Sequence, residues 1–240
     1  MSAIRYGGQD GSIEERSGHS RLGRIAYFVF WRAFYAAIPL IWRLRVDGRE
    51  NLPDGPFILC GNHRSLIDTP IIGMVTSRRM RFMGKEDMWN FRPMGAFLSL
   101  VGGFPVERGT ADRTALRAAE DVLKLGEPLV MFPEGTRKEG PRLRREDLLD
   151  GPAFLAARLG VPLVPVGIGG SARALPIGTR LPRPVKVVAV IGEPIHPPAR
   201  DGGRVPRRVV TDLTDRLHEE LGDLFIEARV LAGDESPPTD

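Results

Sequence analysis

Residues 57–75 read FILCGNHRSLIDTPIIGMV, and this stretch decides the fold class. It opens with a short apolar run, Phe57–Cys60, which is typical of a buried strand. A polar turn leads from there into Leu66–Val75, whose apolar residues recur with helical spacing. A strand followed directly by a helix is the repeating unit of α/β proteins, so we expect that class here.

The same alternation continues along the chain. Further apolar runs predict strands at Arg81–Met83, Phe104–Val106, Leu129–Phe132, Leu163–Val166 and Val185–Ile191. Amphipathic segments predict helices at Phe91–Leu100, Ala111–Leu125, Ala153–Leu159 and Val205–Phe225. The pattern therefore predicts one α/β domain with a mostly parallel mixed sheet flanked by helices. Residues 167–171, GIGGS, are interpreted as a turn after a strand, because they match neither a P-loop nor a nucleophile elbow.

Composition limits the function classes. The chain has 240 residues, of which 42% are hydrophobic and 27% charged, so it is neither disordered nor fibrous. Its one cysteine, Cys60, excludes a disulfide framework and a Cys-based zinc cluster, and its apolar strand predicts a buried thiol. The sequence has no metal-ligand constellation. The net charge of +4 favours an anionic partner, but the arginines are not interleaved with stacking aromatics as nucleic-acid binding prefers.

An aromatic-rich stretch occupies residues 25–42, IAYFVFWRAFYAAIPLIW, between arginine-bearing flanks. We favour a helix lying in a membrane surface. A helix buried against the domain is the second interpretation. A membrane span is the third, because Arg32 near its middle costs about 2.5–3.5 kcal/mol on insertion scales. Pro39 is expected to kink the helix or to end it at Ile38.

The resulting domain prediction has four parts. Residues 1–20 form a flexible tail, and residues 21–44 form membrane-associated helices. Residues 45–230 form the α/β domain, and residues 231–240 form a disordered tail.

The first chemistry-bearing segment is Gly61–Asp68, GNHRSLID. It places His63 in the turn at the carboxyl end of a strand, where open α/β sheets bind ligands. Ser65 is a candidate N-cap, which makes Asp68 the third helical residue of a capping box. From there Asp68 can reach one ring nitrogen of His63, leaving the other as the acceptor that a general base needs. Taken alone, the segment also fits a capped helix with a surface histidine.

Two further segments follow predicted strands. In Gly102–Gly109, GGFPVERG, Arg108 can fork onto a phosphate. In Phe132–Arg137, FPEGTR, a carboxylate and a guanidinium can hold the hydroxyl and the phosphate of one small acceptor. Taken alone, each segment also fits a solvated turn with a surface charge or ion pair.

Together and in this order, these segments resemble the glycerolipid acyltransferase family, the 1-acylglycerol-3-phosphate acyltransferases of bacterial phospholipid synthesis. The Asn-His-x4-Asp block matches at Asn62, His63 and Asp68, the Gly-x-Phe-x-x-x-Arg block at Gly102–Arg108, the Phe-Pro-Glu-Gly-Thr-Arg block at Phe132–Arg137 and the last block at Val161–Val166. The resemblance covers about residues 45–195. It implies a glycerol-3-phosphate acyltransferase-like fold with an N-terminal membrane-docking helical motif.

The resemblance also implies an activity. A fatty acyl group passes from acyl-CoA or acyl carrier protein to the sn-2 hydroxyl of lysophosphatidic acid, giving phosphatidic acid, with no cofactor beyond the thioester co-substrate. His63 acts as general base and Asp68 orients it. The implied substrate-binding residues are Asn62, Lys85, Arg108, Glu134, Gly135, Thr136 and Arg137. The implied location is peripheral or monotopic, on the cytoplasmic face of an anionic membrane.

One departure and three alternatives accompany this interpretation. Many relatives carry Phe-Lys-x-Gly-Ala after the third block, whereas Leu148–Ala153 lacks that lysine and residues 137–147 are rich in arginine. The first alternative is the same chemistry on glycerol 3-phosphate, another lysophospholipid or a glycolipid. The second is a non-catalytic lipid-binding protein. The third is a thioesterase that uses the same base with water.

Overall fold

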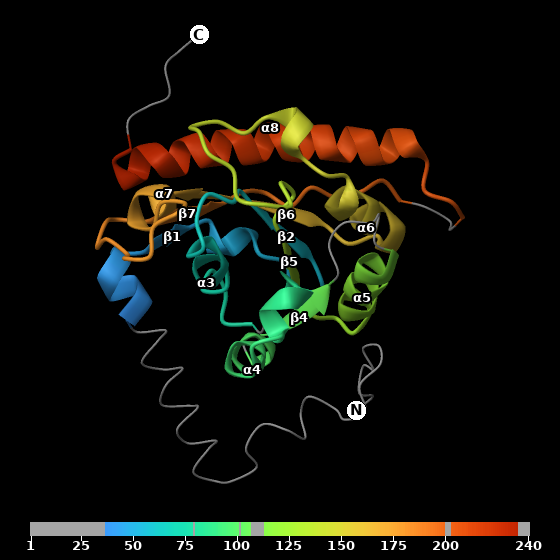
Figure 1. Ribbon diagram of the computed structural model, residues 1–240. Coiled ribbons are helices and arrows are strands. Elements are labelled where there is room, and N and C mark those ends of the chain that lie inside the picture. The colour runs from blue at the N-terminus through green and yellow to red at the C-terminus, as the bar shows by residue number, and fades with distance from the viewer. Residues whose placement is uncertain (1–36, 79, 101, 107–112, 200–202, 235–240) are drawn as a thin grey trace.

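The computed structural model describes residues 37–78, 80–100, 102–106, 113–199 and 203–234 (Figure 1). Within these residues one sheet has the strand order β1-β7-β6-β2-β5-β3-β4. Its strands are β1 Arg45–Asp47, β2 Ile58–Gly61, β3 Arg81–Lys85, β4 Gly103–Val106, β5 Leu129–Met131, β6 Leu163–Gly169 and β7 Val188–Ile191. Neighbouring strands are parallel, except that β6 and β7 are antiparallel. The predicted mostly parallel mixed sheet is confirmed.

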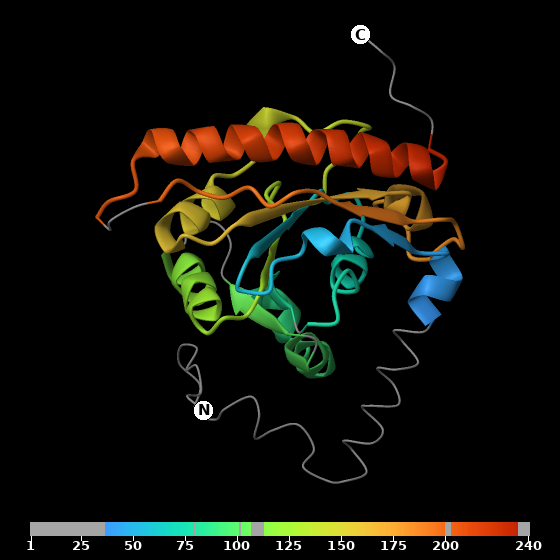
Figure 2. The same ribbon diagram turned by 180° about the vertical axis from the view of Figure 1, so that it is seen from behind.

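Helices cover both faces of the sheet (Figures 1 and 2). The α-helices are α3 Asp68–Ile72, α4 Arg92–Leu100, α5 Arg113–Lys124, α6 Gly151–Leu159, α7 Ser171–Ala174 and α8 Arg207–Ala232, and the short 3-10 turns are η1 Arg49–Asn51, η2 Glu86–Trp89 and η3 Arg145–Asp147. Apolar side chains of α5, α6 and α8 pack on one face. Those of α3 and of the helical residues 37–42 pack on the other.

Strand β2 shows why the deciding stretch is so apolar. Ile58 and Cys60 point into the core beneath α5, α6 and α8, whereas Leu59 points into the core beneath α3. All three are fully buried. Alternate side chains of one strand therefore enter two cores, and a strand in that position needs a continuous apolar run rather than an alternating one.

Helix α8 lies directly on β6 because two glycines let the backbones meet. A Cβ built on Gly167 would lie 2.2 Å from backbone atoms of Leu224, and one on Gly169 would lie 2.2 Å from those of Ala228. The interpretation of residues 167–171 as a turn is wrong for most of that segment, since β6 runs to Gly169 and α7 begins at Ser171. The glycines allow close packing of a helix on a strand, and they do not break the strand.

The ends of the domain differ from the prediction. Strand β1 has no apolar run and was not expected; it is a three-residue edge strand beside β7. Helix α8 continues past Phe225 to Ala232, and Asp234 then accepts a hydrogen bond from the Gly170 N–H at 3.3 Å. Residues 231–234 therefore belong to the folded domain and not to the predicted tail. Residues 235–240 lie outside the described residues.

Only the last turn of the aromatic-rich stretch is described. Residues 37–42 are helical and include Pro39, so the helix does not end at Ile38. Ile38 and Trp42 are buried against the domain, whereas Leu40 and Ile41 are exposed. The predictions for residues 1–36 lie outside the described residues. In the part of the chain that the structure describes, no helix combines the length and apolar character needed to cross a bilayer.

Candidate active site

The sheet topology brings the first and third blocks together. Strands β2 and β5 are parallel neighbours, and so are β2 and β6, so their carboxyl ends lie at one edge of the sheet. His63 lies two residues beyond the end of β2, and the turn Pro133–Arg137 begins just after β5. This is the edge at which open α/β sheets bind ligands.

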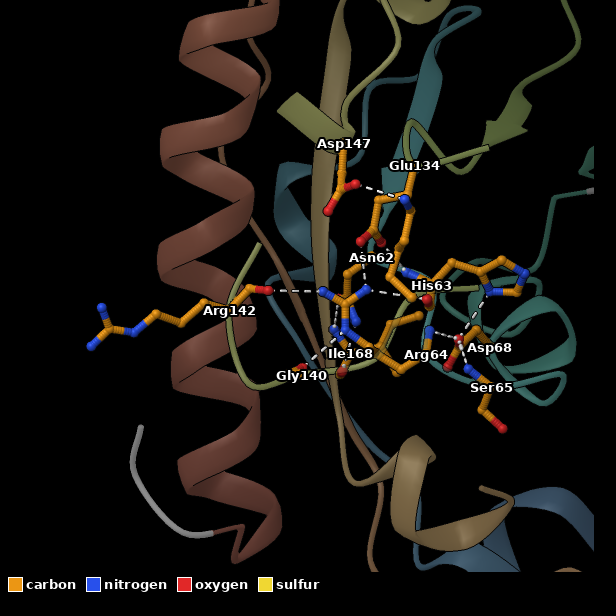
Figure 3. Close-up of polar contacts among 11 residues, drawn as sticks. Asn62, His63, Arg64, Ser65, Asp68, Glu134, Gly140, Arg142, Asp147 and Ile168 are labelled. Carbon is orange, nitrogen blue, oxygen red and sulfur yellow. Dashed lines mark hydrogen bonds and ion pairs between the residues drawn. The ribbon is translucent and has the colours of Figure 1, made fainter. Parts of the chain in front are cut away.

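His63 and Asp68 form a hydrogen-bonded pair at this edge (Figure 3). His63 Nδ1 lies 3.0 Å from Asp68 Oδ2. The same oxygen accepts the backbone N–H groups of Arg64 and Ser65, both at 2.6 Å, and the Asp68 side chain is fully buried. A carboxylate held in this way accepts a hydrogen bond from the Nδ1–H group of His63. The other ring nitrogen, Nε2, then carries no proton and is free to accept one. The imidazole can therefore act as a base.

The start of α3 differs from the predicted capping box. The helix begins at Asp68 with Ile67 as N-cap, and no side chain caps it. Ser65 lies three residues before the first helical residue and is therefore not the N-cap. Its hydroxyl donates to the Leu175 carbonyl at 2.7 Å, which joins the turn to the end of α7, and its oxygen accepts the Ile67 N–H at 3.4 Å. One half of the capping box remains, since the Asp68 carboxylate accepts the Ser65 N–H.

Phe132 supports the imidazole from one side. Its ring stacks on that of His63 with 4.1 Å between centroids and 18° between planes. The His63 side chain is 16% exposed. Stacking and the Asp68 hydrogen bond together restrict the ring's rotation, so the free nitrogen has a defined direction.

Behind His63 lies a buried ion pair that the sequence analysis missed. Arg64 Nη1 lies 2.5 Å from Glu134 Oε1, and both side chains are almost fully buried. The other carboxylate oxygen of Glu134 accepts the His63 N–H at 2.7 Å. Glu134 was expected to bind the acceptor, but its two oxygens face the protein. In this arrangement Glu134 joins the third block to the backbone of the turn that carries His63.

Arg64 also holds the polar loop that follows the third block. Its Nε donates to the Gly140 carbonyl at 3.3 Å, and its Nη2 donates to the Arg142 carbonyl at 3.1 Å (Figure 3). Within the loop, Lys138 Nζ lies 2.6 Å from Asp147 Oδ1, and this hydrogen bond lowers the pKa of the Asp147 carboxyl. The loop is therefore attached to the turn that carries His63. The missed signal was an arginine inside the first block, which a buried carboxylate requires as partner.

Asn62 has a structural role. Its Nδ2 donates to the Ile168 carbonyl at 3.1 Å, and its Oδ1 accepts the Ile168 N–H at 2.7 Å. The side chain is fully buried. It was expected to contact substrate, but it instead fastens the end of β2 to β6 and so positions the His63 turn.

The turn after β5 leaves other side chains facing outward. Gly135 has φ +66°, a left-handed conformation that favours glycine, and its N–H donates to the Phe132 carbonyl at 2.9 Å. Thr136 is exposed and Arg137 is half-buried. Within the described residues, the Arg137 guanidinium has neither a hydrogen bond nor an ion pair, so it can receive an anion.

Lys85 and Arg108 are the two other predicted binding residues. Lys85 is the last residue of β3, at the same carboxyl edge as His63. Arg108 lies outside the described residues.

A cavity of about 560 Å³ adjoins the site on the α8 side. Arg64 forms part of its wall, together with Gly140, Phe225 and Arg229. The Arg64 guanidinium also lies 4.9 Å from the centroid of the Phe225 ring. Arg64 thus separates this cavity from Glu134. Among the described residues, no three potential metal-ligating side chains come together.

Residues 43–169 match the family model described as Acyltransferase. The chain belongs to the acyltransferase family. The matched range contains β2, the His63–Asp68 turn, β5 and the Phe132–Arg137 turn. The protein is an acyltransferase enzyme.

Named relatives agree with the family. The acyltransferase is 28% identical over 185 residues to the 1-acyl-sn-glycerol-3-phosphate acyltransferase of Bacillus subtilis (strain 168), a match covering 75% of this chain and 87% of that protein. It is 32% identical over 111 residues to the lyso-ornithine lipid O-acyltransferase of Pseudomonas aeruginosa, covering 45% and 40% of the two chains. It spans about half the length of its plant, algal and yeast relatives.

A solved structure shares the fold. The crystal structure of the 1-acyl-sn-glycerophosphate (LPA) acyltransferase of Thermotoga maritima superposes with a TM-score of 0.67 at 27% sequence identity. The match covers 94% of the acyltransferase described here and 89% of that chain. The α/β fold that the resemblance implied is confirmed, and the implied N-terminal docking motif stays a prediction.

Proposed function

We propose that this acyltransferase moves a fatty acyl group from acyl-CoA or acyl carrier protein to the sn-2 hydroxyl of lysophosphatidic acid, giving phosphatidic acid. The observation that carries the proposal is the His63–Asp68 pair at the open edge of the sheet. The names of the relatives from Bacillus subtilis and Thermotoga maritima support this acceptor.

In the proposed reaction, His63 Nε2 takes the proton of the acceptor hydroxyl while its oxygen attacks the thioester carbonyl. The carbonyl electrons move onto oxygen and form a tetrahedral intermediate. Collapse of this intermediate breaks the carbon–sulfur bond, and the imidazolium returns the proton to the leaving thiolate. Asp68 keeps the ring in the tautomer with Nδ1–H and stabilises the imidazolium. Because the acceptor attacks directly, no acyl-enzyme is needed.

Arg137 is proposed to bind the acceptor phosphate. A guanidinium presents several N–H donors in a plane and matches phosphate oxygens well. Thr136 adds a hydroxyl on the same turn, and Lys85 and Arg108 complete the proposed phosphate site. Glu134 and Asn62 hold the turn that presents His63, and neither is proposed to touch substrate.

The enzyme is proposed to work as a peripheral or monotopic protein on the cytoplasmic face of an anionic membrane. Its lipid acceptor resides in the bilayer, and residues 21–44 combine aromatics with arginines as interfacial helices do. The membrane lipid is therefore both the supporting surface and the source of the acceptor.

An acceptor panel with labelled acyl-CoA tests the function. Lysophosphatidic acid should be acylated faster than glycerol 3-phosphate, lysophosphatidylcholine or a glycolipid. His63→Ala should abolish transfer, and Asp68→Asn should lower kcat by about 10²–10⁴-fold with little change in KM for the acceptor. Turnover retained in His63→Ala would contradict the mechanism. Free fatty acid released equally fast without acceptor would instead indicate a thioesterase.

The match to the Pseudomonas aeruginosa enzyme favours a lyso-ornithine lipid as second candidate acceptor. The panel should include it, and Arg137→Ala separates the two cases. If the acceptor phosphate is the recognised group, this variant raises KM for lysophosphatidic acid. If the phosphate is not recognised, KM stays unchanged and the lyso-ornithine lipid is the better acceptor.

A further inference from the structure

Two exposed apolar segments lie side by side at one end of the sheet. Leu40 is 79% exposed in the helical residues 37–42, and Leu181 is 82% exposed in the loop after α7. Trp42 Nε1 donates to the Arg183 carbonyl at 3.1 Å and so fastens the two segments together. Both views show the helical turn beside the loop that leaves α7 (Figures 1 and 2). Ile177 adds a further exposed aliphatic side chain on that loop.

The charged side chains of these two segments are all basic. The sequence carries no acidic residue from 37 to 46 or from 171 to 192. In the second range, Arg180 and Arg183 flank Leu181, and both are exposed. Exposed aliphatic side chains among arginines match the boundary between acyl chains and anionic headgroups, where guanidinium groups meet lipid phosphates. The occupant that fits is therefore an anionic bilayer.

The loop is also stiff. Residues 176–184, PIGTRLPRP, contain three prolines, whose fixed φ angles limit the conformations of the free loop. At its two ends, the Thr179 N–H donates to the Pro176 carbonyl at 3.1 Å and the Arg183 N–H donates to the Ala174 carbonyl at 2.7 Å. A loop already ordered loses little entropy when its tip enters a membrane interface.

This surface is continuous with the active site. The Ser65 hydroxyl donates to the carbonyl of Leu175, the residue just before the loop, at 2.7 Å. The neighbouring Leu66 is 54% exposed, three residues from the catalytic histidine. A bilayer resting on the loop would therefore lie beside the turn that carries His63.

We propose that residues 176–184, named here the docking loop, insert their apolar tip into the headgroup region of an anionic bilayer beside residues 37–42. The docking loop thereby holds the mouth of the His63 site against the membrane, so that a lipid acceptor enters sideways. The docking itself is independent of the proposed acceptor, whereas its benefit for turnover rests on the proposed function.

The first test compares Leu181→Asp with Leu125→Asp in the full chain. Leu125 is also an exposed leucine, at 57%, but it follows α5, on the other side of the molecule from α7 (Figure 1). Flotation with vesicles of phosphatidylcholine and phosphatidylglycerol, at graded lipid concentrations, measures the partition coefficient. Leu181→Asp should lower it by about 10- to 100-fold, the equivalent of one buried leucine, and Leu125→Asp should leave it unchanged. Thermal melts should show both variants folded.

The second test addresses charge. Arg180→Glu with Arg183→Glu should remove the preference for anionic over pure phosphatidylcholine vesicles. Unchanged binding of Leu181→Asp to anionic vesicles would overturn the proposal. So would a Leu181→Asp variant that changes the oligomeric state on gel filtration while binding vesicles as before, because the surface would then be a contact between protein copies.

Turnover separates this proposal from the proposed function. With a short-chain acceptor below its micelle concentration, Leu181→Asp should work as fast as the unchanged protein, and with a vesicle-embedded acceptor it should be slower. A protein that binds vesicles through the docking loop but acylates no acceptor would overturn the function alone. A protein that acylates lysophosphatidic acid while Leu181→Asp binds vesicles normally would overturn the docking loop alone.

Discussion

Glu134 and Arg137, two charged residues of the third block, have different surroundings. Glu134 belongs to the third block and was expected to contact the substrate. One of its carboxylate oxygens instead pairs with Arg64, and the other accepts the His63 backbone N–H. Arg137, three residues later, has no such partner within the described residues. Neighbouring charged residues of one motif therefore differ in their surroundings: Glu134 holds the turn, and we propose that Arg137 binds the ligand.

This difference predicts that substitutions at the two positions affect different quantities, stability at Glu134 and acceptor KM at Arg137. Glu134→Gln leaves Arg64 buried without a counter-charge, and breaking a buried pair in this way costs about 3–5 kcal/mol of unfolding free energy. Arg137→Ala should change stability by less than about 0.5 kcal/mol and should instead raise KM for the acceptor. Urea denaturation and steady-state kinetics on both variants measure the two effects. An Arg137→Ala variant as unstable as Glu134→Gln would contradict the assignment.

The His63–Asp68 pair was predictable because it is local. Five residues separate the two, and a strand, a turn and the start of a helix are enough to bring them together. The roles of Glu134 and Asn62 were not predictable in the same way. Their partners lie 70 and 106 residues away in sequence, and only the pairing of β2 with β5 and β6 brings them near. A motif tells which residue types are needed, but it does not tell what each one touches.

At the level of elements, the packing of α8 on β6 was the main feature that the sequence did not predict. The apolar runs predicted the strands because a doubly covered sheet needs them. Residues 167–171, which include Gly167 and Gly169, were interpreted as a turn because they match neither a P-loop nor a nucleophile elbow. Here a helix backbone takes the place of the side chains that these two glycines lack, and local sequence carries no sign of that helix. Strand β1 was missed for a related reason, since its pairing with β7 and not its own composition defines it.

Two glycine-to-alanine substitutions test this packing with the same added methyl group. In Gly169→Ala the Cβ would lie 2.2 Å from the Ala228 backbone, so α8 must move, and such overpacking costs about 1–3 kcal/mol. Gly222 lies within α8, and a Cβ there meets nothing within 4 Å. Gly222→Ala should stabilise the protein by up to about 1 kcal/mol through helix propensity. Urea denaturation midpoints that move in opposite directions confirm the close contact, and equal midpoints contradict it.

At the level of the whole molecule, one buried thiol reports on the entire domain. Cys60 lies in β2, between β5 and β6, and is fully buried. It is the only cysteine in the chain. Burial raises the pKa of the Cys60 thiol well above its ordinary range, because the low-dielectric core disfavours the thiolate. No local opening of a surface loop exposes a central strand, so alkylation of Cys60 requires unfolding of the sheet.

The raised pKa of Cys60 makes stability depend on pH above neutrality. The unfolded thiol ionises near pH 8.5, whereas the folded thiol stays protonated, so the unfolded state binds fewer protons at high pH. The thiol's contribution to stability is complete below about pH 8.5 and is lost as pH rises, by up to about 1.4 kcal/mol per pH unit. Urea denaturation at pH 7.5, 8.5 and 9.5 should show a larger fall in unfolding free energy for the unchanged protein than for Cys60→Ala. The variant has all the other titrating groups, so the difference between the two falls comes from the thiol. Parallel pH profiles for the two proteins would mean that the thiol ionises within the folded sheet, and iodoacetamide would then label it at the same rate with and without urea.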